Sequence, residues 1–218
     1  MELTKQKNYQ QAFDLACASL RELDIEERAT RAGAEYLKSE KGEAILLSFF
    51  SEPYRIHSPQ LEFRGSASSV VSLAVRTLLL HYLLRADGSP LAGRWVSYQD
   101  IPGGLLYAGV FAKRVTEPLA KTFGRSHNLF MDAGLQLGGK PVSVGDASFI
   151  LWALPSVPLQ FVLWEGDDEF PPKVHLLFDA SVDHYLSLED VVVLGQMAAR
   201  RLIQRSRPQS VSTSSSAT

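Results

Sequence analysis

The chain has 218 residues, a length that suits one large domain or a compact two-lobed domain. Hydrophobic residues make up 45% of it and charged residues 21%, and the formal net charge of −2 gives no global field that would hold nucleic acid or an anionic membrane. We therefore expect a sizeable core, and neither nucleic acid nor a membrane as a partner.

Cys17 is the one cysteine of the chain, which excludes an internal disulfide and an all-cysteine metal site. Its apolar neighbours indicate a helix face, where a buried, inert thiol is favoured over a reactive one. The first residues are polar and lack the apolar core of a signal peptide, and no segment has the roughly 20 apolar residues of a membrane span. These features predict a cytoplasmic protein.

The first residues of the chain predict two helices followed by a short antiparallel meander. Residues 9–23 place apolar side chains at helical spacing, and Asp24 then fits the N-cap of a short second helix. A meander of two or three strands is predicted from one apolar run and two alternating runs, over 44–50, 54–56 and 61–63.

Residues 66–86 carry the strongest helical pattern in the sequence. Their apolar side chains form one broad face, and Ser68 or Ser69 can serve as the N-cap. A glycine and a proline follow the apolar face and end the helix. The segment after them, which contains Trp95 and Tyr98, is predicted to be a loop.

Three more helices are predicted in the second half of the chain. The first covers 105–123 and is expected to kink or restart at Pro118, because proline lacks the N–H that a helix needs. The second covers 127–137 and is stopped by a glycine pair. The third covers 187–205, with Ser187 as N-cap, acidic residues in its first turn and arginines in its last turns.

The β-prone runs of the second half are 149–154, 159–164 and 173–178. The first two are close enough to form a hairpin, and the charged turn 165–169 leads from the second run to the third. The acidic residues of that turn could bind a hard cation, but they lack the alternating spacing of a calcium loop. A solvated hairpin end is the favoured interpretation.

Strand runs that are joined by hairpins and separated by blocks of helix predict the α+β class. We expect a mainly antiparallel sheet of about five to six strands packed against helices. One such domain should cover residues 1–205. Residues 206–218 are rich in serine and threonine without a hydrophobic anchor, which predicts a disordered tail.

Several blocks, in one order, resemble an uncharacterised domain-of-unknown-function family of small proteins from anaerobic bacteria and archaea. The resemblance spans about residues 40–205 and is carried by LHYLLRADGSPLAGRWVSY (80–98), PSVPL (155–159), WEGDDEFP (164–171), LFD (177–179) and YLSLED (185–190). Some members carry an added cysteine-rich segment and are labelled iron–sulfur proteins. With Cys17 alone, this chain cannot supply the ligands of such a cluster. The resemblance implies a fold and, by association, a setting of anaerobic one-carbon and metallocofactor metabolism.

One carboxylate–imidazole combination near the C-terminus is a candidate site. His184 follows Asp179 and Asp183 on the connection between the last strand and the last helix. A carboxylate beside an imidazole can orient it for metal binding or proton transfer. Asp179 and His184 are therefore the candidate metal ligands.

Aromatic residues supply a second candidate site. Trp95, Tyr98 and Trp164, together with Trp152 and Tyr107, provide large flat apolar surface. This surface would suit a flat, mostly apolar ligand if some of these residues line a cleft between helices and sheet. Together with the setting of the resembling family, this suggests a tetrapyrrole, either a corrinoid or a haem. The candidate axial ligands are His81, His175 and His184.

Three functions remain open from the sequence. A non-catalytic accessory protein that binds a small ligand or metallocofactor is the first, because the sequence has no phosphate-binding loop, nucleophile elbow or metalloprotease helix. It predicts a large apolar cleft with one available histidine. An enzyme that uses Asp/His general acid–base chemistry near Asp179, Asp183 and His184 is the second. A protein-interaction module, with an exposed apolar patch, is the third.

Overall fold

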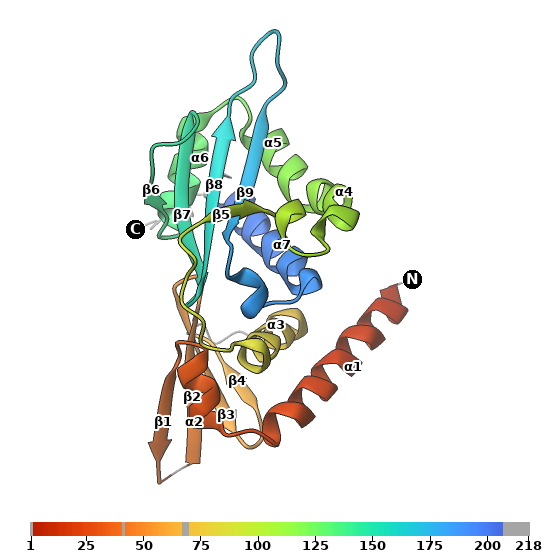
Figure 1. The fold of residues 1–218 in the computed structure, drawn as a ribbon, viewed down its shortest axis with the longest axis vertical. Helices are drawn as coiled ribbons and strands as arrows, with labels where there is room; N and C mark the ends of the chain where they lie inside the picture. Colours follow the sequence, from red (N-terminus) through yellow and green to blue (C-terminus); the bar gives the residue numbers. More distant parts are fainter. Residues whose placement is uncertain (1, 41, 67–69, 207–218) are drawn as a thin grey trace, which may run out of the picture.

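The computed structural model describes residues 2–40, 42–66 and 70–206, and it places their strands in two antiparallel sheets (Figure 1). The first sheet has four strands in chain order: β1 (Glu35–Ser39), β2 (Gly42–Phe49), β3 (Glu52–Ser58) and β4 (Glu62–Arg64). The second has five strands, which from edge to edge are β5 (Trp95–Ser97), β9 (Lys173–Asp179), β8 (Val157–Trp164), β7 (Ala147–Leu154) and β6 (Lys140–Pro141).

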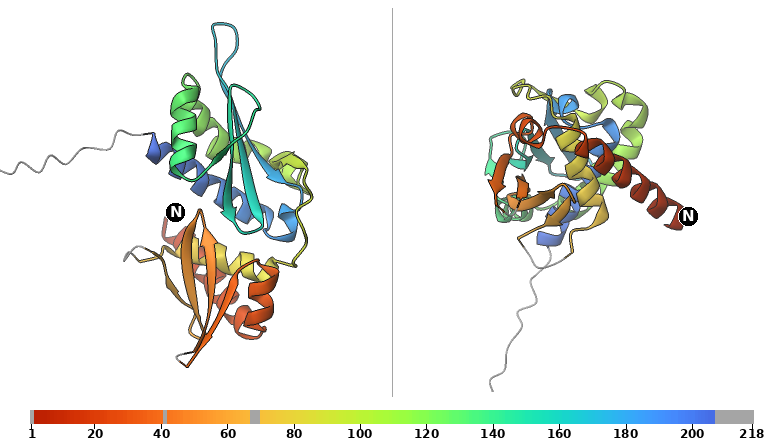
Figure 2. Two further views of the ribbon diagram at one scale, coloured as in Figure 1. Left: turned by 90° about the vertical axis from the view of Figure 1, so that its left-hand side faces the viewer. Right: turned by 90° about the horizontal axis from the view of Figure 1, so that it is seen from below.

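The helices pack against these sheets and against one another. They are α1 (Glu2–Arg21), α2 (Ile25–Arg31), α3 (Leu73–Arg85), α4 (Ala108–Phe111), α5 (Glu117–Phe123), α6 (His127–Gln136) and α7 (Leu188–Arg205). The first sheet lies with α1, α2 and α3 in one half of the molecule, and the second sheet lies with α4 to α7 in the other (Figure 2). α5 contacts β9, α6 contacts β7, and α7 contacts both of these helices and α3.

One continuous hydrophobic core runs through both halves. Tyr82 of α3 is fully buried, and its hydroxyl donates to the Ala32 carbonyl at 2.7 Å and accepts from the Ser156 N–H at 3.2 Å. The Phe50 N–H, in the β2–β3 turn, donates to the Ala153 carbonyl of β7 at 2.9 Å. Apolar packing and buried hydrogen bonds therefore join the two sheets.

The antiparallel α+β class is confirmed, and the strands are divided between two sheets. The predicted count of about five to six strands falls short because β1, β5 and β6 lie at sheet edges. β1 is polar and largely exposed, β5 has three residues and β6 has two. Strands that are this polar or this short lack the apolar runs by which a strand is recognised in a sequence. β5 also places Trp95 in a strand where a loop was predicted.

The predicted helix 66–86 is shorter in the structure, because α3 begins at Leu73 and Ser72 is its N-cap. The Ser72 hydroxyl accepts from the Val75 N–H at 3.4 Å. Ser68 and Ser69, the predicted caps, lie outside the described residues, as does the predicted tail apart from Ser206.

The predicted helix 105–123 is a chain of helical segments rather than one uniform helix. A 3₁₀ helix over Gly104–Tyr107 leads into α4, and a π-helical turn over Ala112–Thr116 separates α4 from α5. The Glu117 N–H donates to the Ala112 carbonyl, and Pro118, which has no N–H, occupies the start of α5. The predicted restart at Pro118 is confirmed.

The other predicted helices agree closely with the structure. Asp24 and Ser187 are the N-caps of α2 and α7, and each accepts a hydrogen bond from a backbone N–H of the first turn. None of the helices in the described part of the chain has both the length and the apolar character that a membrane crossing requires.

Candidate functional site

A cavity of about 620 Å³ lies between α1, α3, α4 and α7. We call it the His81 pocket. Its lining combines aliphatic and aromatic side chains with a small polar group, and the members used below are Tyr98, Tyr107, Val110, Arg114, His81, Glu189 and Asp190. Pockets for small molecules commonly have volumes of roughly 300–1,000 Å³ and a few polar groups on an apolar wall, so this cavity has the dimensions of a ligand site.

The polar centre of the pocket is a hydrogen-bonded pair between His81 of α3 and Asp190 of α7. His81 Nδ1 and Asp190 Oδ1 are 2.8 Å apart, and the side chains are 31% and 13% exposed. Asp190 is itself held in place, because its Oδ2 accepts from the Ser187 hydroxyl at 2.6 Å and its N–H donates to that hydroxyl at 3.2 Å. The cap of α7 therefore orients the carboxylate, and the carboxylate orients the imidazole.

This pair sets the protonation of His81. The hydrogen bond to Asp190 raises the pKa of His81, burial opposes it, and the charges of Asp190 and Glu189 add to the increase. The net effect is a pKa above the ordinary histidine value, which is about 6.5. Because Nδ1 is engaged by Asp190, Nε2 is the ring nitrogen left to meet a ligand.

An aromatic wall and an apolar rim complete the pocket. The ring of Tyr98 stacks on Phe111 with 4.4 Å between centroids and an interplanar angle of 6°, and this contact fixes the wall. The 3₁₀ helix that carries Tyr107 also exposes two large apolar side chains: Leu105 is 72% exposed and Leu106 86%.

Of the other predicted axial ligands, His175 lines a smaller cavity of about 320 Å³, together with Tyr98, Phe111 and Glu117. Burial lowers the pKa of His175, and the charge of Lys173 lowers it further. Tyr98 thus belongs to both cavities, whereas His81 and His175 line different ones.

The predicted metal ligands Asp179 and His184 have separate partners. The carboxylate of Asp179 accepts from the N–H groups of Ala92 and Gly93 at 2.8 Å each, and from the N–H and hydroxyl of Ser181 at 3.0 and 2.7 Å. Burial alone would raise the pKa of Asp179, but these hydrogen bonds outweigh it and lower the pKa. Asp179 therefore holds the loop before β5 against the end of β9.

His184 is half exposed and pairs with Asp87 of the loop after α3, at 2.7 Å between Nδ1 and Oδ2. The Ser89 hydroxyl lies 3.2 Å from the same ring nitrogen. Because both contacts use Nδ1, this Ser–His–Asp group lacks the geometry of a proton relay from hydroxyl to carboxylate. Within the described residues, no group of three or more histidine, cysteine, aspartate or glutamate side chains could hold a metal ion.

None of the three tryptophans lines the His81 pocket. Trp95 lies on the edge strand β5 opposite Asp179, and Trp164 ends β8 opposite Lys173 with 48% of its surface exposed. Of the residues that the sequence singled out, the structure therefore brings together His81, Tyr98 and Tyr107 in this pocket.

Sequence reasoning missed Asp190 and Arg114 as site residues. Asp190 was recognised as an acidic residue in the first turn of a helix, which is its local role. Its partner His81 precedes it by 109 residues, and no local pattern connects two positions so far apart. The signal available in the sequence was the position of His81 beside the apolar face of the predicted helix 66–86.

The fold and the pocket together define the class of this protein: an α+β chain of two antiparallel sheets with a histidine-bearing pocket between its helices. The chain belongs to the family described as Domain of unknown function (DUF3786), whose sequence profile matches residues 24–201. No curated protein and no solved structure matches the chain.

Proposed function

We propose that this chain is a non-catalytic accessory protein that binds a small ligand or metallocofactor in the His81 pocket. The observation that carries the proposal is the His81–Asp190 pair on the wall of a largely apolar cavity of about 620 Å³. A histidine that binds a metal usually donates its other ring N–H to a carboxylate, which fixes the ring and increases its basicity. His81 has such a partner, and it lies at a ligand-sized cavity.

A tetrapyrrole, either a corrinoid or a haem, is the ligand class that we propose. Its flat apolar body would lie against Tyr98 and Tyr107, and its metal would take Nε2 of His81 as axial ligand. Arg114, which also lines the pocket, could pair with an acidic substituent of the ring. The resemblance to proteins of anaerobic bacteria and archaea, in a setting of metallocofactor metabolism, supports the same class by association.

The test is a titration of the purified protein with haemin and with cobalamins, followed by desalting. We expect a change in the visible spectrum of one cofactor and its retention by the protein, and we expect His81→Gln to abolish both. The matched control is His184→Gln, because His184 is half exposed and lies outside the pocket. A wild-type protein that leaves both spectra unchanged, or a His81→Gln variant with the wild-type spectrum, would contradict the proposal.

An enzyme with general acid–base chemistry is the second candidate, and the same pair favours it. The imidazole of His81, oriented by Asp190, could transfer a proton at Nε2. This places the chemistry at His81 rather than near Asp179, whose oxygens are occupied by backbone and serine donors. Mass spectrometry of the protein purified anaerobically from its own source separates the two: a bound metallocofactor supports the first, and a bound organic substrate or product supports the second.

A further inference from the structure

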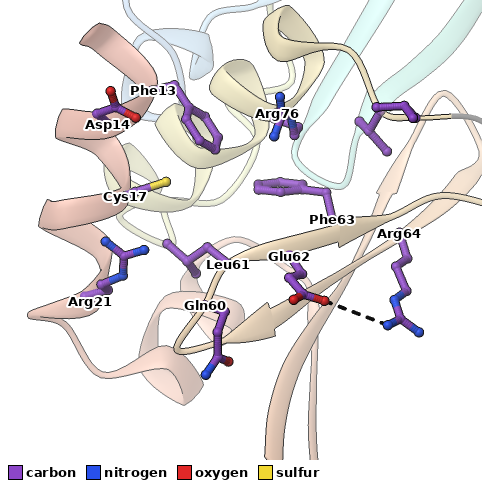
Figure 3. A pocket seen from close by; sticks show the side chains of 12 residues that line it. Phe13, Asp14, Cys17, Arg21, Gln60, Leu61, Glu62, Phe63, Arg64 and Arg76 are labelled. Atoms are coloured by element: carbon purple, nitrogen blue, oxygen red, sulfur yellow. Dashed lines mark ion pairs between the residues drawn. The ribbon is translucent and has the colours of Figure 1, made fainter. Parts of the chain in front are cut away.

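A second cavity, of about 560 Å³, lies in the half of the molecule that holds the first sheet. It is bordered by α1, by the end of the β3–β4 connection with β4, and by the start of α3 (Figure 3). We call it the Arg76 pocket. None of the lining residues that the structure assigns to it also lines the His81 pocket, so the two are separate.

Cationic side chains exceed anionic ones in this pocket. Its lining contains Arg21, Arg64 and Arg76 against Asp14 and Glu62. The guanidinium of Arg64 lies 3.8 Å from the Glu62 carboxylate, and both side chains are largely exposed. The Nε of Arg21 donates to the Pro59 carbonyl at 3.1 Å, which fixes that side chain at the pocket wall.

Arg76 is the cation without a polar partner. Its Nε is buried and has no hydrogen-bond acceptor among the described residues, and no described carboxylate lies within 4.0 Å of its guanidinium. The guanidinium lies over the ring of Phe13, 4.8 Å from the centroid, which supplies an apolar face but no acceptor. An anion that entered this pocket would supply the guanidinium with the acceptor and the counter-charge that the described residues do not give it.

Two aromatic rings lie beside this cation. The rings of Phe13 and Phe63 are 6.2 Å apart between centroids and tilted by 52°, and Figure 3 shows both pointing toward the interior of the pocket next to Arg76. An arginine fork beside aromatic faces recognises a carboxylate or phosphate that is attached to a flat apolar group.

We propose that the Arg76 pocket binds a small organic anion in which a carboxylate or a phosphate is joined to a planar apolar group. The anionic group would accept from the guanidinium of Arg76, and Arg21 lines the same pocket as a second cation. The planar group would contact Phe13 and Phe63. Cys17 belongs to the apolar wall and supplies no nucleophile, because burial raises the pKa of its thiol.

The proposal is tested by isothermal titration calorimetry with phenyl phosphate, benzoate and benzyl alcohol as probes. We expect at least one of the two anions to bind in the millimolar range or tighter and the neutral alcohol to bind more weakly. The stronger of the two anions then tells whether the site prefers a phosphate or a carboxylate. Arg76→Met retains the length of the side chain and should weaken that binding by about tenfold or more.

Arg200→Met is the matched control, because Arg200 is exposed and lines neither this pocket nor the His81 pocket. It should leave the affinity for the anion unchanged, and Phe63→Leu should lower it with thermal unfolding still cooperative. Absence of binding by either anion would overturn the proposal. So would equal affinities of the wild type and Arg76→Met, or a loss of affinity in Arg114→Met rather than in Arg76→Met, because Arg114 lines the His81 pocket and the anion would then bind there.

Discussion

At the scale of single residues, the His81–Asp190 pair is the group through which pH should act on this protein. It joins α3 to α7 by one hydrogen bond that is charge-assisted when the imidazole is protonated. Because the pair raises the pKa of His81, the folded state holds that proton more tightly than the unfolded chain does. Such a pair stabilises the fold at the acidic side of its titration.

The first prediction concerns this pH dependence. The stabilisation should be fully present below the unfolded pKa of about 6.5 and should be lost as pH rises through the higher folded pKa of His81. The difference in free energy of unfolding between the wild type and His81→Gln should therefore be largest at acidic pH and should decrease toward alkaline pH. Urea unfolding of both proteins over this range measures it.

The other histidines do not affect the comparison between the wild type and His81→Gln. Hydrogen bonding to Asp87 raises the pKa of His184, and burial lowers that of His175, but both residues are present in the two proteins and their effects cancel in the difference. A difference in the free energy of unfolding that increases with pH would contradict the raised pKa of His81. Binding of a metal by His81 should follow the opposite course and strengthen as pH rises, because the ligand must be the neutral imidazole.

At the scale of elements, the contact between α6 and β7 depends on a glycine. Gly134 of α6 faces the ring of Phe149 of β7, and a Cβ at this position would lie 2.5 Å from the nearest ring atom. Phe149 is fully buried, stacks on Phe161 and contacts Phe130 with tilted rings, so it cannot move aside easily. The small residue allows the helix to approach the sheet closely.

The second prediction follows from this close approach. Gly134→Ala should destabilise the protein by about 1–3 kcal/mol, which is the usual cost of forcing additional volume into a packed core. Gly109→Ala is the control, because Gly109 is an exposed residue of α4 and a Cβ there meets no atom within 4 Å. That substitution should be neutral or should stabilise by about 0.5–1 kcal/mol. Urea unfolding compares the two variants, and equal effects would contradict this account of α6.

At the scale of the whole molecule, α7 links the second half to the first sheet. The guanidinium of Arg201 lies over the rings of Phe49 and Phe50, at 5.0 and 4.5 Å from their centroids. Those rings belong to the end of β2 and its turn, which also bonds to Ala153 of β7. Since the core is continuous across both sheets, we expect the described chain to unfold as one unit.

The third prediction tests that cooperativity. The tryptophans Trp95, Trp152 and Trp164 all lie in the second sheet, so their fluorescence reports on that sheet, while far-UV circular dichroism reports on both. The two thermal transitions should coincide. Arg201→Met should lower both by about 2–8 °C through the loss of the cation–π contacts, and Arg200→Met, at an exposed position, should lower neither. Separate transitions would mean that residues 1–205 form two domains.

Local interactions explain which features of the fold could be predicted from the sequence. The caps Asp24 and Ser187 were predicted because an N-cap depends on residues within one turn of the helix. The restart at Pro118 was predicted because proline lacks the N–H group and so removes a hydrogen bond from the helix that contains it. The antiparallel α+β class was also determined, since short links between apolar runs favour hairpins.

Only the tertiary structure decided which distant residues meet. Asp179 and His184 were predicted to form one site because they are near each other in the chain. In the structure, Asp179 accepts hydrogen bonds from the loop before β5, and His184 pairs with Asp87. His81 is hydrogen-bonded to Asp190, which is 109 residues away, and the strands are divided between two sheets. The physical reason is that contacts between elements arise from burial of their apolar faces, and the same faces can be buried in many pairings that a linear pattern does not distinguish.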